Sequence, residues 1–400
     1  MNSRQIGSTL RVATLSVAVV FVACGGKGTG GNAGPDGGGS GGTAAGGGTG
    51  AVGAGGSSLG GYAGVGLGGS GGTGLVGTID PSQPGTQPPA PAGGGIGTGT
   101  TPTVLAIRRV RLGEIDPSGA PNPNAWASMG YNLDGLISTK TGTNHCKRQP
   151  NTSPTNQEDG NGGIDNSFGK NILPILKTFV PVPSGEAAAA LEQGGETILL
   201  KLDNLDAATN QTGINASAYQ ASALTGLPSW NGSDVRSVTS DSVNGGNVSD
   251  AKVKFPSSYV ANGVWVSGGA GGTLTLLLSV GGTPLPLPIS RVLITMNVHG
   301  PGAAATQGMI VGVIQTEALV AEFEKVAGTL TAGQLCPGNP TLEGALVSVR
   351  QASDIMADGS NGDPNQTCDA ISVAIGFETG PVQLGGLAPP VAPPPDPCAN

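Results

Sequence analysis

The chain has 400 residues, including 73 glycines and 31 prolines, and only 11% of its residues are charged, against a typical figure of about 25%. So much glycine with so few charges predicts that part of the chain does not pack into a core. The formal net charge of −8 argues against nucleic-acid binding through a basic surface. No apolar run reaches the roughly 18 residues that a membrane-spanning helix needs.

Residues 1–23 have the organisation of a secretory signal. Two arginines and no acid precede the short apolar segment 12–23, which ends directly before Cys24. Small residues before a cysteine resemble the lipobox of bacterial lipoproteins, although Phe21 stands where Leu is commoner. The resemblance implies removal of the signal before Cys24 and lipidation of the Cys24 thiol, which anchors the chain in a membrane. The alternative is an ordinary secretory signal followed by a chance cysteine.

Residues 24–104 are predicted to be a disordered tether. Its first part is about half glycine, and residues 79–102 are rich in proline, so neither part buries enough apolar surface to fold. Gly25 follows the cysteine, which favours the outer membrane under the lipoprotein sorting rule. We therefore expect a bacterial cell-envelope protein that contacts the membrane through its lipid anchor, with an envelope, glycan or protein partner and no nucleic acid.

Residues 105–386 are predicted to form a mainly β globular domain, a β-sandwich with two or three helical insertions. The expected strands are short, β-branched segments bounded by turn residues: 104–112, 196–205, 259–267, 273–280, 292–298 and 309–314. Gly281 and Gly282 predict a hairpin turn. The proline-containing run 285–289 after it predicts an edge strand, because proline cannot donate to a sheet.

Three segments of the domain have the spacing of amphipathic helices. Residues 316–327 and 341–357 carry apolar residues on one helical face, and residues 186–191 are a weaker third candidate. The chain ends in a proline-rich tail, residues 387–400.

Four cysteines remain besides Cys24, and an even number in an exported chain predicts two disulfides. They are Cys146, Cys336, Cys368 and Cys398. Three pairings are possible. We favour Cys336 with Cys368, because these two flank the second late helix, and Cys146 with Cys398, which pins the tail.

An acidic loop region is the strongest candidate site. Its metal-ligand candidates are Asp134, Asp159, Asn161 and Asp165. Carboxylate and amide oxygens on a glycine-rich loop suit Ca²⁺, so calcium is the candidate cofactor. The loop is not an EF-hand, because Lys170 occupies the position of the twelfth ligand. The alternative is an Asx-rich turn whose carboxylates cap backbone amides. A second acidic loop, with looser spacing, holds Asp354, Asp358, Asp363 and Asp369.

No catalytic residue is predicted. The two histidines, His145 and His299, have no neighbouring serine and acid in the sequence that would form a triad. Glycoside hydrolysis stays an open alternative, because its two carboxylates need not be close in sequence. Trp230, on a polar loop, could stack on a sugar or pack in the core.

Four short motifs beyond the signal are similar to a group of uncharacterised bacterial surface lipoproteins. They are residues 130–135 (GYNLDG), 165–169 (DNSFG), 259–263 (YVANG) and 368–372 (CDAIS), the last followed by Gly376-Phe377. The resemblance covers about residues 105–385 and implies a shared domain without an assigned activity. We expect a non-enzymatic, membrane-anchored lipoprotein presenting a binding or structural domain. The alternatives are a secreted glycan-active hydrolase and an apolar-ligand carrier, the latter suggested by the run 274–294.

Overall fold

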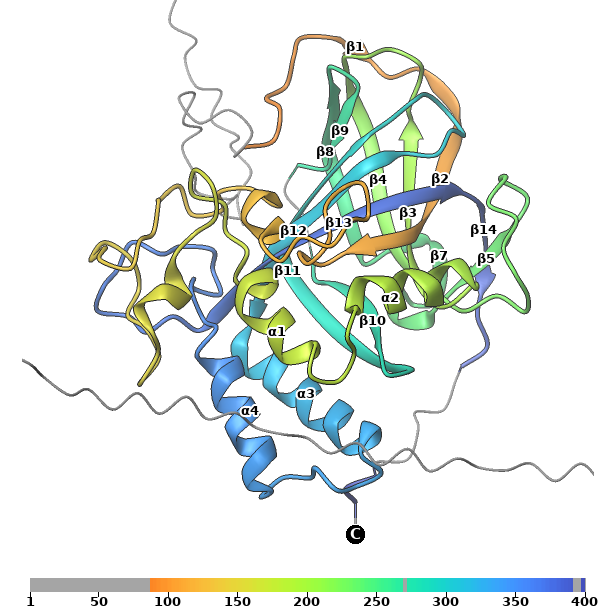
Figure 1. Cartoon of the computed structure of the whole chain (residues 1–400). Helices are drawn as coiled ribbons and strands as arrows, with labels where there is room; N and C mark the ends of the chain where they lie inside the picture. Colours follow the sequence, from red (N-terminus) through yellow and green to blue (C-terminus); the bar gives the residue numbers. More distant parts are fainter. Residues whose placement is uncertain (1–86, 269–271, 391–396, 400) are drawn as a thin grey trace, which may run out of the picture. The chain divides into compact units, whose positions relative to one another are not determined.

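The computed structural model describes residues 87–268, 272–390 and 397–399 (Figure 1). The strands are β1 (Gly95–Ile96), β2 (Gly99–Arg111), β3 (Thr197–Asn204), β4 (Gln211–Ala221), β5 (Val235–Val238), β6 (Val243–Asn244), β7 (Asn247–Ala251), β8 (Val253–Ala261), β9 (Val264–Val266), β10 (Leu274–Val280), β11 (Thr283–Asn297), β12 (Thr306–Gln315), β13 (Ala370–Pro381) and β14 (Gln383–Leu387). The α-helices are α1 (Leu173–Leu176), α2 (Pro183–Glu192), α3 (Thr316–Leu330) and α4 (Pro340–Arg350), and a π-helical segment, Phe168–Ile172, precedes α1. The predicted signal, Cys24 and most of the predicted tether lie outside these residues.

The main sheet closes on itself. Eight antiparallel strands follow one another in the order β4, β3, β2, β13, β12, β11, β9 and β8, and β8 pairs again with β4. The closing contact pairs Gln211 with Val260 and Ala218 with Val253. The prediction of a mainly β domain is confirmed, but a closed, barrel-like sheet stands where two packed sheets were expected.

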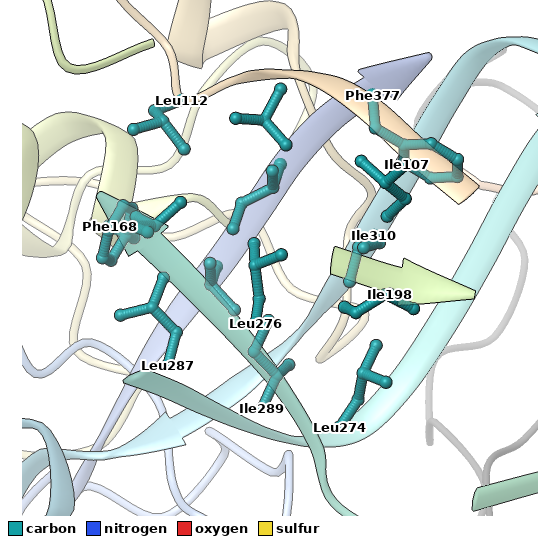
Figure 2. Close-up of a cluster of buried hydrophobic side chains, with 14 of the residues drawn as sticks. Ile107, Leu112, Phe168, Ile198, Leu274, Leu276, Leu287, Ile289, Ile310 and Phe377 are labelled. Carbon is teal, nitrogen blue, oxygen red and sulfur yellow. The ribbon is translucent and has the colours of Figure 1, made fainter. Parts of the chain in front are cut away.

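Side chains alternate between the inside and the outside of this sheet, as the two-residue period of a strand requires. On β13, Ile371, Val373 and Ile375 belong to the main core, whereas Ala370 and Ala374 face a separate cluster. Figure 2 shows the main core between the sheet strands and the β10–β11 hairpin, whose Leu274, Leu276, Leu287 and Ile289 point into it. The run 274–294, which suggested an apolar-ligand carrier, thus packs its leucines and isoleucines into the core. A hollow lined by Val280 and Leu285 has a volume of about 10 Å³.

The predicted hairpin at Gly281 and Gly282 is confirmed, with Val280 opposite Thr283 and positive φ at both glycines. The proline run lies on β11, where Pro284, Pro286 and Pro288 pair with β10 on one side only, and pairing with β12 begins at Ser290. The expected strand 259–267 is in fact a hairpin. Asn262 and Gly263 both have positive φ and form the turn between β8 and β9.

The three expected helices are present, with different ends. α2 begins before the predicted segment, and α3 runs on to Leu330. α4 ends at Arg350, seven residues before the predicted end, because the chain turns there and Ile355 forms a β-bridge with Ala370. None of the helices in the described ranges has the length and apolar character needed to cross a membrane.

All four predicted cysteines form disulfides, but the favoured pairing is wrong. The bonds join Cys146 to Cys368 and Cys336 to Cys398, with Cα–Cα distances of 5.3 and 5.5 Å. Flanking α4 in the sequence does not bring Cys336 and Cys368 together. After α4 the chain returns to the sheet and meets the segment around Cys146, so that Lys147 pairs with Thr367, whereas the tail passes the end of α3 near Cys336.

Candidate functional site

Two segments far apart in the sequence form a lobe of irregular chain beside the sheet, at the left of Figure 1. We call residues 113–167 and 351–369 the loop lobe. Its apolar residues Leu133 and Ile355 pack on the outward-facing Val311 and Ala374 of β12 and β13. The Cys146–Cys368 disulfide joins the two segments. Both segments are thereby fixed on a rigid sheet, which is the usual support for functional loops.

Four aspartates of the loop lobe form what we call the acidic cluster: Asp134, Asp159, Asp165 and Asp354. Three of them were candidate ligands, and Asp354 comes from the second acidic loop. The charges of Asp134, Asp159 and Asp354 all raise the pKa of Asp165. The structure thus unites residues from both acidic loops, which lie about 200 residues apart in the chain.

Each carboxylate of the cluster already accepts hydrogen bonds. Asp165 Oδ2 accepts from the Leu133 amide at 2.6 Å, and Asp134 Oδ1 accepts from the Leu136 amide at 2.7 Å. Asp159 accepts from the amide of Ser138, and Asp354 accepts from the amide and hydroxyl of Ser372. Only the bond from Leu136 to Asp134 is local, as an Asx turn requires. The other three carboxylates accept from amides 18 to 32 residues away in the sequence.

Burial raises the pKa values of these carboxyls, and repulsion between them adds to the effect. The pKa of Asp159 is raised to about 8 and that of Asp354 to about 7, in both cases chiefly by burial. Burial also raises the pKa of Asp165 well above its ordinary value, and that of Asp134. Lys170, over the ring of Trp126 at 5.1 Å, provides a nearby positive charge that partly opposes the rise at Asp159.

The remaining candidate ligands lie outside the cluster. The side chain of Asn161 donates to Ser128 Oγ at 2.7 Å. Asp358 and Asp363 accept from amides of their own exposed turns, and Asp369 accepts from the amide of Ala357. Within the described ranges, no three His, Cys, Asp or Glu side chains are placed to hold one metal ion. Calcium binding stays a prediction.

The two histidines differ in environment. His299 is on an exposed loop, with Nε2 3.3 Å from Thr306 Oγ1. His145 is buried, and its Nδ1 donates to the carbonyl of Cys146 at 3.1 Å, while its Nε2 has no hydrogen-bond partner. His145 also lies near the acidic cluster, where it acts electrostatically on the carboxyl of Asp134.

A cavity of about 420 Å³ opens beside the Cys146–Cys368 disulfide, and we call it the disulfide cavity. Residues between 142 and 157 line it, together with Pro364. Four buried polar atoms on these residues lack hydrogen-bond partners: His145 Nε2, Arg148 Nη1, Thr152 Oγ1 and Gln157 Oε1. None of the acidic cluster lines the cavity.

Sequence reasoning named His145 but missed Arg148, Thr152 and Gln157. These three follow no periodicity and match no motif, and a cavity depends on contacts between distant segments. The one local signal was the adjacency of His145, Cys146 and two cations in a polar loop.

Comparison of this chain with protein-family models, with curated proteins and with solved structures finds no match.

Proposed function

We propose that this chain is a lipoprotein, anchored through Cys24 in the bacterial cell envelope, that presents a β-rich domain for binding a partner without chemical turnover. The support for the anchor comes from the sequence around Cys24. The support for binding comes from one observation, the disulfide cavity with its buried polar atoms that lack partners.

Unpartnered polar atoms favour a ligand on energetic grounds. Leaving a buried donor or acceptor without a partner costs about 1–3 kcal/mol. Proteins therefore satisfy nearly all such groups, and exceptions call for an explanation. Here four exceptions belong to residues that line one cavity, and polar residues around a cavity of a few hundred Å³ are characteristic of small-molecule sites.

The acidic cluster, by contrast, has a structural role. Its carboxylates accept bonds from backbone amides that position the loop lobe, including those of Leu133 and Leu136. This engagement supports a stabilising role for the cluster and a binding role for the cavity beside it.

Fractionation of cells that express the full chain tests the anchor. We expect wild type in the membrane fraction, released only by detergent, and the Cys24→Ala variant unprocessed or in the soluble fraction. Ser40→Ala, in the same glycine-rich segment, is the control and should behave as wild type. A Cys24→Ala protein that is processed and stays membrane-bound would remove the lipoprotein proposal.

A glycan-active hydrolase is the second candidate, and the raised pKa values of Asp159 and Asp354 favour it. A carboxyl that keeps its proton near neutral pH can act as a general acid towards a glycosidic bond. Incubation of the purified chain with a polysaccharide panel decides between the two. Release of reducing ends that disappears in Asp159→Asn but persists in Asp358→Asn would establish the hydrolase.

Calcium is a further part of the proposal, as an ion that stabilises the acidic cluster. Its support is the concentration of the half-buried Asp134 and Asp159 around the buried Asp165, where a cation would relieve repulsion between carboxylates. Binding would require these carboxylates to exchange some of their present hydrogen bonds for the ion.

A further inference from the structure

The Cys146 carbonyl holds two side chains that line the disulfide cavity. It accepts both from His145 Nδ1 at 3.1 Å and from Gln157 Nε2 at 2.9 Å. Because a carbonyl cannot donate, His145 Nδ1 carries the hydrogen of this bond. Gln157 keeps its Oε1 as an acceptor without a donor. Both side chains are more than nine-tenths buried and line the cavity.

Backbone hydrogen bonds hold the same wall to the second segment of the lobe. The Lys147 amide donates to the Gln366 carbonyl at 2.7 Å, and the Cys368 amide donates to the Lys147 carbonyl at 2.9 Å. Gln149 Nε2 donates to the Cys368 carbonyl at 2.7 Å. The polar atoms of the cavity are therefore preorganised, which reduces the ordering cost of binding.

The cavity is cationic. Lys147 and Arg148 line it, and neither forms an ion pair with the part of the chain that the structure describes. None of the residues that line it is Asp or Glu. A guanidinium whose Nη1 is buried without an acceptor suits a carboxylate or phosphate oxygen, which it binds through charge-assisted hydrogen bonds.

The other unpartnered atoms require a second type of group on the ligand. Gln157 Oε1 accepts hydrogen bonds, and a carboxylate or phosphate oxygen without a hydrogen cannot donate them. A hydroxyl group can donate to Gln157 Oε1. Because a hydroxyl both donates and accepts, it can also pair with His145 Nε2 and with the Thr152 hydroxyl. A ligand that satisfies all four atoms therefore combines an anionic group with several hydroxyls, in a molecule that fits about 420 Å³.

We propose that the disulfide cavity binds a small hydroxylated anion, carried by a sugar acid or a sugar phosphate. The Arg148 guanidinium, with Lys147, holds the anionic group, Gln157 accepts from one hydroxyl, and His145 pairs with another. This inference rests on the binding function proposed above and gives its ligand a chemical class.

Calorimetric titration of the full chain tests the proposal with four probes: D-glucuronate, glucose 6-phosphate, D-glucose and inorganic phosphate. We expect glucuronate or glucose 6-phosphate to bind at least about tenfold more tightly than glucose and than inorganic phosphate. If glucuronate binds more tightly than glucose 6-phosphate, the ligand is a sugar acid, and the reverse order indicates a sugar phosphate.

Variants locate the binding. Arg148→Ala should lose about tenfold or more in affinity for the anionic sugar, and Thr152→Val a few-fold. Arg350→Ala is the matched control, because Arg350 lies on α4 and pairs with Glu317 away from the cavity. Far-ultraviolet circular dichroism and thermal melting of each variant confirm that it is folded before its affinity is compared.

Three results would overturn the anion proposal: glucose binding as tightly as the charged sugars, Arg148→Ala binding as wild type, or no binding of any probe. The binding function itself is judged separately, on immobilised envelope glycans and proteins. A partner retained there after the four probes fail would leave the binding function standing without this ligand class.

Discussion

Asp159 and Asp354 give the loop lobe an unusual response to pH. Both carboxyls have pKa values raised chiefly by burial, to about 8 and about 7. In the unfolded chain an aspartate titrates near pH 4. Between these values the folded protein holds protons that the unfolded chain has lost, so its stability falls as pH rises.

We therefore predict that the free energy of unfolding decreases from about pH 5 to pH 8, opposite to ordinary acid denaturation. A pKa difference of one corresponds to about 1.4 kcal/mol, so the change should be measurable by urea unfolding at each pH. Asp354→Asn should flatten the slope, because an amide does not titrate. The variant should keep the fold, since the amide can still accept from the Ser372 amide and donate to its hydroxyl.

Asp358→Asn is the matched control for this pH series. Asp358 is exposed, and its pKa is lowered, chiefly by a hydrogen bond from Ser360. A group with a lowered pKa contributes stability that is lost only as pH falls below about 4. The control should keep the wild-type slope between pH 5 and 8. A wild-type stability that is flat or rises over this range would contradict the account of the cluster.

The same cluster provides the test of calcium. At pH 8, where more of the carboxyls are ionised than at pH 5, excess calcium should raise the melting temperature by several degrees, since a hundredfold excess over Kd stabilises by about 2.7 kcal/mol. EDTA should reverse the shift. Asp165→Asn should abolish it, whereas Asn161→Ala, whose side chain bonds Ser128, should keep it. An unchanged melting temperature would contradict calcium binding and leave the cluster only its role of accepting hydrogen bonds from backbone amides.

At the scale of single elements, Gly308 on β12 lies opposite Phe377 on β13. A Cβ at Gly308 would overlap the ring of Phe377, which belongs to the main core. We predict that Gly308→Ala destabilises the protein by about 1–3 kcal/mol through overpacking. Urea unfolding measures the change.

Gly344→Ala is the counterpart on α4, where an added Cβ meets no atom within 4 Å. Because alanine favours helix, this variant should stabilise by about 0.5–1 kcal/mol. If the two variants changed stability equally, the inferred close contact between Gly308 of β12 and Phe377 of β13 would be contradicted.

The elements that sequence predicts well are those with a strong local pattern. The strand at 104–112 is a short apolar run containing β-branched residues, and the turn at Gly281-Gly282 consists of residues that accept positive φ. The end of α4 was missed because the apolar spacing continues past Arg350, whereas pairing of Ile355 with Ala370 turns the chain. That pairing is a tertiary contact and leaves no local signal.

At the scale of the whole molecule, long-range contacts decide both the fold and the site. Pairing of Gln211 with Val260 closes the sheet, and the disulfide from Cys146 to Cys368 spans 222 residues. The sequence supplied the four cysteines and three members of the acidic cluster, but neither partner choice nor the addition of Asp354 could be predicted from spacing. The disulfide cavity exists only because these distant segments meet.

Removal of each disulfide should have a different effect. The double variant Cys146→Ser/Cys368→Ser should lose about 2–5 kcal/mol of stability and its affinity for ligand, because this bond joins the walls of the cavity. Cys336→Ser/Cys398→Ser, which frees the tail from the end of α3, should lose stability but keep affinity. Urea unfolding and titration measure both, and non-reducing peptide mapping that found Cys336 joined to Cys368 would contradict the pairing.

The central claim is that the loop lobe binds an acidic ligand in the disulfide cavity and does not transform it. Wild type and Arg148→Ala should be applied side by side to immobilised acidic and neutral glycans, with reducing ends measured in the same wells. The account predicts that wild type is retained on acidic glycans, that retention is lost in Arg148→Ala, and that no reducing ends appear. Release of reducing ends, or retention that is equal in the two proteins, would contradict it.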